Sequence, residues 1–125
     1  MNEHQSEEHF KNKIRLALQN LAEKRETASY RQLAIAAEIP GPQIIHKLTH
    51  LLEEILREDH EAGNWPSLAI LAVSRTEPAI PRAGFFIFLR EQLGLYSSKN
   101  DEGPDAEAFH AALLESLWNC LNQKP

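Results

Sequence analysis

The segment 42–59 constrains the fold of this 125-residue chain more than any other part of the sequence. Its apolar side chains recur every three or four residues, a spacing that places them on one face of an α-helix. They are Ile44, Ile45, Leu48, Leu51, Leu52, Ile55 and Leu56. Because an isolated helix of this length is marginal in water, such a stripe must be buried against other elements. We therefore expect a helix over 42–59 at the centre of a mainly α domain.

The same spacing, together with capping residues and turn-forming prolines and glycines, predicts further helices. Thr27 or Ser29 can cap the short second helix, and a proline-rich turn separates that helix from the third. The polar residues 1–9 are expected to form a flexible N-terminus. The additional helices are predicted over 10–24, 30–37 and 85–94, and from 104–105 onward.

A β-permissive segment, 68–74, lies between the third and fourth predicted helices. It is followed by the loop 75–84, in which a second strand over 79–81 would have to lie at a sheet edge because proline lacks an N–H. Three helices followed by a β-element is the order of a winged helix-turn-helix. We therefore predict one winged-helix-like domain over 10–125, with 68–84 as the wing and a C-terminal helical extension.

The amino-acid composition excludes several classes of protein but does not identify a ligand. Apolar residues make up 42% and charged residues 25% of the chain, values typical of a globular domain. The single cysteine excludes an internal disulfide, and neither a signal peptide nor an apolar run of membrane-spanning length is recognisable. These features predict a cytoplasmic protein. Its 13 basic and 18 acidic residues give a net charge of −5, which does not favour a dedicated nucleic-acid binder.

A six-residue pattern opens the predicted helix-turn-helix, Ser29-Tyr30-Arg31-Gln32-Leu33-Ala34. A Pro40-Gly41 corner follows it, and after the third helix come the proline-led apolar segment 66–73 and the glycine-containing segment 82–85. In this order, roughly half of the chain resembles the DNA-binding half of the alkylguanine-DNA alkyltransferase and alkyltransferase-like group. That family opens its helix-turn-helix with threonine-tyrosine-glycine, an acidic residue, leucine or isoleucine, and alanine. The resemblance implies a winged helix-turn-helix that binds DNA.

Two functional residues of that group do not carry over to this sequence. The family's reactive strand carries Pro-Cys-His-Arg, whose cysteine accepts the alkyl group, whereas 66–73 contains neither Cys nor His. Its recognition helix carries an intercalating arginine, where this chain has isoleucine or histidine. The single cysteine, Cys120, is expected to be buried on the apolar face of the last helix. The resemblance therefore implies DNA binding without alkyl transfer, and we predict a non-enzymatic binding module that acts as a DNA-associated regulator or adaptor.

The DNA-binding prediction assigns 42–58 as the recognition helix, supported by 30–37. A recognition helix reads base edges with its N-terminal residues, and basic residues of a wing reach phosphates or the minor groove. The candidate DNA-contacting residues are Ser29, Tyr30, Arg31, Gln32, Gln43, His46, Lys47, His50, Arg75 and Arg82.

A protein-protein interaction module is the alternative function. The segment 85–88 contains three phenylalanines, more aromatic surface than one face of an amphipathic helix can hide. Aromatic residues at a protein surface commonly mark partner contacts. The candidate interface residues are Trp65, Phe86 and Trp118, and the partner would be another protein or a second copy of this chain.

Two histidines on the third helix also fit a metal-site spacing. His46 and His50 lie four residues apart, with Glu53 and Glu54 one turn further along. However, the residue after His46 is Lys47 and not the glutamate that metalloproteases place there. A solvated helix face is the favoured interpretation, and no metal or other cofactor is predicted.

Overall fold

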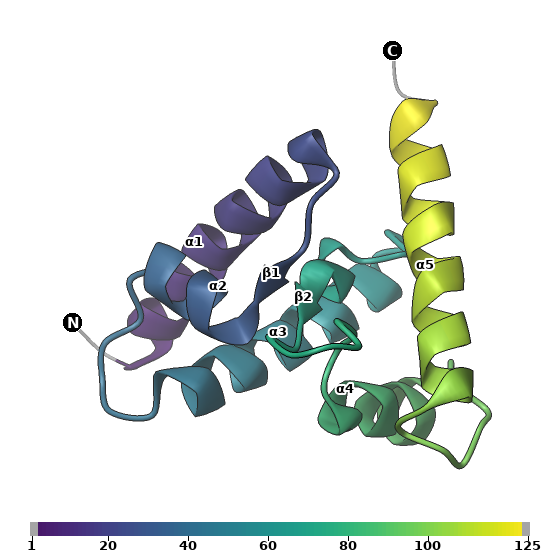
Figure 1. Ribbon diagram of the computed structural model, residues 1–125. Coiled ribbons are helices and arrows are strands. Elements are labelled where there is room, and N and C mark those ends of the chain that lie inside the picture. Colours follow the sequence, from purple (N-terminus) through teal and green to yellow (C-terminus); the bar gives the residue numbers. More distant parts are fainter. Residues whose placement is uncertain (1–2, 124–125) are drawn as a thin grey trace.

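Within residues 3–123, which this computed structural model describes, five α-helices form most of the structure. A 3-10 turn, η1 (Leu68–Leu71), precedes the fourth helix, and a π-helical segment, η2 (Leu89–Leu93), continues it. The predicted mainly α fold is confirmed. The helices, labelled in Figure 1, are α1 (Glu3–Lys24), α2 (Tyr30–Ala36), α3 (Ile44–Glu61), α4 (Ala83–Phe88) and α5 (Pro104–Asn122).

Several helix boundaries differ from the sequence prediction: α3 ends at Glu61 and not at 59, α4 begins at Ala83 and not at 85, and the starts of α1 and α3 also differ. Helix α1 begins at Glu3 and not near Phe10, so residues 3–9 are helical, while residues 1 and 2 of the predicted flexible terminus lie outside the described part of the chain. Helix α3 begins at Ile44 and not at Pro42, because the backbone of Gln43 turns into the left-handed conformation with φ 59°. The first turn of a regular helix cannot include such a residue.

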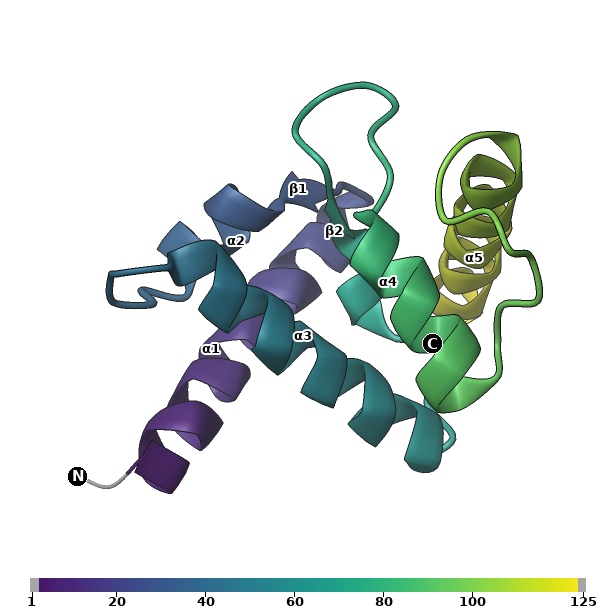
Figure 2. The same cartoon turned by 90° about the horizontal axis from the view of Figure 1, so that it is seen from below.

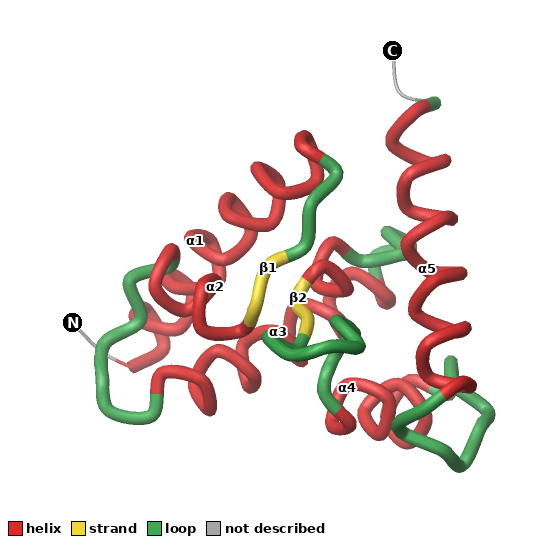
Figure 3. Tube along the Cα trace, viewed as in Figure 1, coloured by secondary structure: helices red, strands yellow, loops and turns green. Residues whose placement is uncertain are grey.

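The β-structure is a short parallel pair that joins two distant parts of the chain. Strand β1 (Ala28–Ser29) pairs with β2 (Ala72–Val73), with Ala28 opposite Ala72, as the yellow segments in Figure 3 show. The predicted strand over 68–74 is therefore wrong for its first four residues. There the hydroxyl of Ser67 accepts the N–H of Ala69 at 3.1 Å and begins the η1 turn.

The loop 74–82, which joins β2 to α4, projects from the helical body (Figure 2). It contains no strand, so the second strand predicted over 79–81 does not form. The N–H of Ser74 donates to the carbonyl of Ile80 at 2.8 Å and closes the loop at its base. Because Pro78 and Pro81 lack an N–H, a longer ladder cannot follow.

Helix α3 lies at the centre of the core, as its apolar stripe predicts. Five of the seven stripe residues are buried, and the two at its start, Ile44 and Ile45, are half-buried. Side chains of α1, α2 and η1 pack against the stripe, among them Leu18, Leu33 and Ile70. The hydrophobic effect thus accounts for the placement of α3 against these three elements.

The carboxylate of Asp59, near the end of α3, ties three segments together. Its Oδ1 accepts from the Arg15 guanidinium of α1 at 3.0 Å, and its Oδ2 accepts from the Ser67 hydroxyl at 2.6 Å. The Asp59 residue is buried, and both of its oxygens have partners, which is the condition under which a buried charge is tolerated. The end of α3 is thereby fixed to α1 and to the start of η1.

His110 fixes α5 to the same core. Its ring is 2% exposed, and Nε2 lies 2.9 Å from the carbonyl oxygen of Ile70. Because a carbonyl oxygen only accepts, Nε2 carries the proton and donates it to this bond. Burial disfavours the charged imidazolium and lowers the pKa of His110 below its ordinary value.

We expect the free energy of unfolding to decrease as the pH falls below about 6.5, the usual pKa of histidine in an unfolded chain. The reason is that the unfolded chain then binds a proton that folded His110 takes up only at lower pH. Urea unfolding at pH 7.5, 6.5 and 5.5 measures this loss. In His110→Gln, which keeps an N–H donor, the loss across this interval should be smaller. An equal loss in wild type and variant would contradict the assignment.

Candidate functional site

Three of the predicted DNA-contacting residues line one hollow between α3, β2 and the start of α4. These are Tyr30, His46 and Arg82, and the hollow has a volume of about 460 Å³. We call it the α3–α4 hollow. In Figure 2, α3 and α4 cross the face turned toward the viewer, and the loop 74–82 projects beside them. The polar and aromatic lining residues are Tyr30, His46, Thr49, Glu53, Arg82 and Phe85.

Tyr30 has a structural role in this hollow and does not offer its side chain to solvent. The residue is 6% exposed, which contradicts its prediction as a DNA contact. Its hydroxyl oxygen accepts the backbone N–H of Arg82 at 2.9 Å, and the Arg82 guanidinium carbon lies 4.8 Å from the centre of the Tyr30 ring. Burial raises the pKa of the Tyr30 hydroxyl, which keeps it neutral. Tyr30 therefore fixes the end of the loop 74–82 against the start of α2.

A second hollow lies beside the strand pair of β1 and β2. Arg31, Gln32 and Arg75 line it, together with residues of the strand pair, around a volume of about 500 Å³. Ser29 and Gln32 are engaged in a capping box: the Ser29 hydroxyl accepts the Gln32 N–H, and the Gln32 side chain accepts the Ser29 N–H. Both arginines are exposed, and neither forms a hydrogen bond or ion pair with the described side chains. Their positive charges face solvent.

The remaining candidates on α3 point in different directions. Gln43 is exposed, and its side chain makes no capping bond at the start of the helix. The ammonium of Lys47 donates to the carbonyl of Pro40 at 2.9 Å and so braces the turn between α2 and α3. His50 faces α1, where its Nε2 lies 3.4 Å from Glu7 Oε1. The structure therefore separates His50 from His46, which lines the α3–α4 hollow.

Two basic residues of α1 form ion pairs with carboxylates in the acidic half of α3. Lys11 donates to Glu58 at 2.6 Å, and Arg15 contacts Glu58 and Asp59, each at 3.0 Å. The hydrogen bond from Lys11 is the main cause that lowers the pKa of Glu58 below its usual range. The sequence analysis did not identify these partners of the acidic residues at the end of α3. The sequence feature that could have indicated them is the spacing of Lys11 and Arg15, which lie one helical turn apart on the same face of α1.

Thr49 and Glu53 are the polar residues of the α3–α4 hollow that sequence reasoning did not place there. They follow His46 by three and seven residues, which puts all three on one face of the helix. Partial burial raises the pKa of the Glu53 carboxyl, while the nearby His50, Arg57 and His46 oppose this shift. The hollow thus combines a carboxylate, a guanidinium, an imidazole and the rings of a tyrosine and a phenylalanine in a mainly apolar wall.

The aromatic surface predicted at 85–88 does not form. Phe86 is completely buried, which contradicts its prediction as an interface residue, and Phe85 and Phe88 are buried as well. The reason is that α4 packs on two sides: the Phe86 ring lies 5.2 Å from that of Tyr96, and 6.4 Å from that of Phe109 on α5. A helix enclosed in this way has no free aromatic face.

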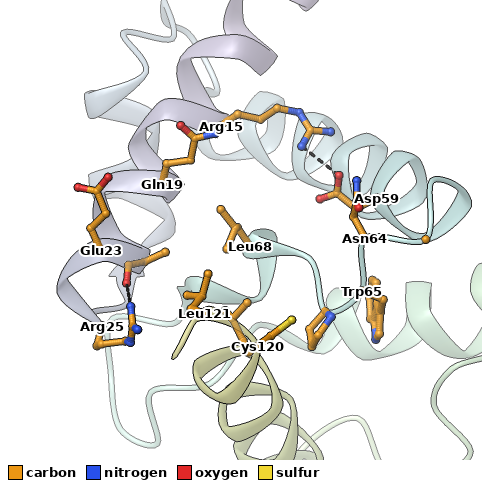
Figure 4. A pocket seen from close by; sticks show the side chains of 14 residues that line it. Arg15, Gln19, Glu23, Arg25, Asp59, Asn64, Trp65, Leu68, Cys120 and Leu121 are labelled. Carbon is orange, nitrogen blue, oxygen red and sulfur yellow. Dashed lines mark hydrogen bonds and ion pairs between the residues drawn. The ribbon is translucent and has the colours of Figure 1, made fainter. Parts of the chain in front are cut away.

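Trp65 and Trp118 are half-buried around a groove between α1 and α5. Trp65 lines the groove itself and stacks edge-on with His60, while Arg25 lies over Trp118 at 5.5 Å. Figure 4 shows this groove, which has a volume of about 670 Å³, with Leu68 between the two walls. Cys120 is exposed there, which contradicts its predicted burial. The face of α5 that carries Cys120 is turned toward the groove and not toward the core.

No protein-family model, curated protein or solved structure matches this chain. Its function must therefore be inferred from its own residues. In the described part of the chain, no helix has both the length and the apolar character needed to cross a membrane.

We expect Tyr30→Phe to loosen the loop 74–82, because the Arg82 N–H then loses its acceptor. The loss should cost about 1–2 kcal/mol of unfolding free energy and accelerate hydrogen exchange at the Ser74 and Arg82 amides. Tyr96→Phe is the matched control, since the Tyr96 hydroxyl donates to the carbonyl of Asn100 in a different loop. Unchanged loop exchange in Tyr30→Phe, or equal acceleration in the control, would contradict the role assigned to Tyr30.

Proposed function

We propose that this protein is a non-enzymatic DNA-binding module of the winged-helix type. The N-terminal half of α3 enters a groove of the duplex, and the loop 74–82 acts as the wing and contacts the neighbouring backbone. The order of elements supports this proposal, since α1, α2 and α3 are followed by β2 and a projecting loop. The wing differs from the usual hairpin because it is closed by one hydrogen bond between Ser74 and Ile80.

The observation that carries the proposal is the contact between Tyr30 and Arg82. It brings the end of the wing and the exposed His46 of α3 to the same hollow. Two elements that must touch one duplex are thus fixed relative to each other before DNA arrives. Preorganisation of this kind reduces the entropy lost on binding.

Local charge supports DNA binding more than the net charge of −5 does. Lys11 and Arg15 engage the acidic half of α3, so these carboxylates are partly neutralised within the protein. Arg31 and Arg75 remain exposed in the hollow beside β1. Arginines in such positions are suited to phosphate contacts, which position a protein on the duplex.

A relationship to the alkyltransferase-like group would agree with this function, and we propose it on the motif around Tyr30. Alkyl transfer is not part of the proposal. Cys120 lines the groove between α1 and α5, whereas the lining of the α3–α4 hollow contains no cysteine among the described residues. A thiolate nucleophile is therefore lacking where α3 and the wing meet.

We expect the chain to bind mixed-sequence duplex DNA more weakly at 200 mM than at 50 mM salt, measured by fluorescence anisotropy. Arg31→Ala and Arg75→Ala should each reduce the slope of log K against log salt by about one unit, because each removes one phosphate contact. Lys99→Ala is the matched control, since it removes an exposed cation from the loop before α5. No binding at 50 mM salt, or an equal effect of Lys99→Ala, would contradict the proposal.

The second candidate function is protein binding at the groove between α1 and α5. It is favoured by the half-buried Trp65 and the apolar Leu68 and Leu121 that line this groove. Substitution separates the two functions. Trp65→Ala should weaken a protein complex and leave DNA affinity unchanged, whereas Arg75→Ala should do the reverse.

A further inference from the structure

The α3–α4 hollow continues into a smaller, adjoining hollow between the same two helices. The adjoining hollow has a volume of about 290 Å³, and Glu53 of α3 and Gly84 of α4 line both hollows. We call the two together the α3–α4 cleft. The α3–α4 hollow alone, at about 460 Å³, falls within the range of about 300–1,000 Å³ that is typical of small-molecule pockets. The cleft is therefore large enough for a small organic ligand.

Gly84 lies where the two hollows meet. Its backbone is not in the left-handed region, so the local conformation does not require glycine, and a Cβ at this position would meet no neighbouring segment within 4 Å. The space beside Gly84 is thus part of the cleft, and a larger side chain at this position would occupy it.

The wall between the charged groups of the cleft is apolar. Leu52, Leu56, Ala72 and Phe85 line the α3–α4 hollow and are otherwise buried in the core. Ile87, which is 38% exposed, extends this wall into the adjoining hollow. Because covering apolar surface is favourable in water, this wall suits a ligand with an apolar body.

The carboxylate of Glu53 determines the charge that such a ligand should carry. It is half-buried, and no hydrogen bond or ion pair to it forms among the described residues. Burial raises the pKa of Glu53, although the nearby His50, Arg57 and His46 act in the opposite direction. A partly desolvated carboxylate without a direct partner is stabilised by a cation placed beside it.

The other charges of the cleft leave room for a cation at Glu53. Glu91 lines the adjoining hollow and adds a second negative charge, with Arg90 no nearer than 3.7 Å. Arg82 lines the α3–α4 hollow, but its guanidinium lies over the Tyr30 ring, and it is not among the charges that shift the pKa of Glu53. The part of the cleft around Glu53 is therefore acidic.

We propose that the α3–α4 cleft binds a small organic amine. The ammonium of the ligand pairs with the Glu53 carboxylate, and its apolar body covers the wall formed by α3, β2 and α4. A charged hydrogen bond to a half-buried carboxylate fixes the orientation of the ligand, and the apolar contact supplies most of the affinity. This binding site goes beyond the proposed DNA-binding function and does not depend on it.

The test is an NMR titration of the full ¹⁵N-labelled chain with 2-phenylethylamine, which combines one ammonium with one aromatic ring. We expect saturable shifts of backbone amides centred on Glu53, Gly84 and Ile87. Two further probes, 2-phenylethanol and 3-phenylpropanoate, keep the aromatic body but lack the positive charge. Each should bind at least tenfold more weakly than the amine.

Three variants locate the site on the chain. Glu53→Gln removes the charge with little change of shape and should lower the affinity for the amine at least tenfold. Gly84→Leu fills the space where the hollows meet and should abolish binding. Glu61→Gln is the matched control, because it makes the same change at the exposed end of α3, outside the cleft, and its affinity should equal that of wild type.

The amide spectrum and melting temperature of each variant separate loss of the site from loss of the fold. Glu53→Gln should keep both, since no hydrogen bond to Glu53 forms in the described part of the chain. The proposal is overturned if the amine gives no saturable shifts in the cleft, if 2-phenylethanol binds as tightly, or if folded Glu53→Gln keeps the wild-type affinity. None of these measurements uses DNA, so the two proposals can fail separately.

Discussion

The hydrogen bond between the Tyr30 hydroxyl and the Arg82 N–H is the contact on which the proposed site depends. Tyr30 opens α2, directly after β1, and Arg82 ends the loop that leaves β2. The parallel pairing of β1 with β2 fixes the start of this loop, and Tyr30 fixes its end. Tyr30 is buried against the core. The loop is therefore anchored to the helical body at both of its ends. A projecting loop thereby keeps a defined position beside α3.

Charge pairing determines which half of α3 can approach a polyanion. The C-terminal half carries a run of carboxylates, and without α1 their combined field would repel phosphates. Lys11 and Arg15 offset this field locally, and the Asp59 carboxylate at the same time joins α3 to α1 and Ser67. The same ion pairs therefore contribute both to the stability of the fold and to the proposed function. Substitutions in α1 would affect both, although α1 does not line the α3–α4 hollow.

Sequence periodicity predicted the elements whose structure is local. The apolar stripe of α3 is as expected, Ser29 is the one of the two candidate residues that caps α2, and the helix predicted over 85–94 ends at Gly94, where φ is 67°. Periodicity does not show how many sides of a helix are covered, which is why Phe86 was expected at the surface. The pairing of 28–29 with 72–73 is a contact between distant segments, and no local pattern encodes it. For the candidate site, the chain positions of the polar residues were predictable, but their grouping into two separate hollows was not.

The most direct test of the central claim, that α3 and the loop 74–82 form one surface for DNA, is an NMR titration. Duplex DNA would be added at low salt to the ¹⁵N-labelled chain, and the backbone amide shifts would be followed. The account predicts that the largest changes occur together over 43–47 and 74–82, with one common titration curve. Changes confined to the groove between α1 and α5, or no change in either segment, would contradict it.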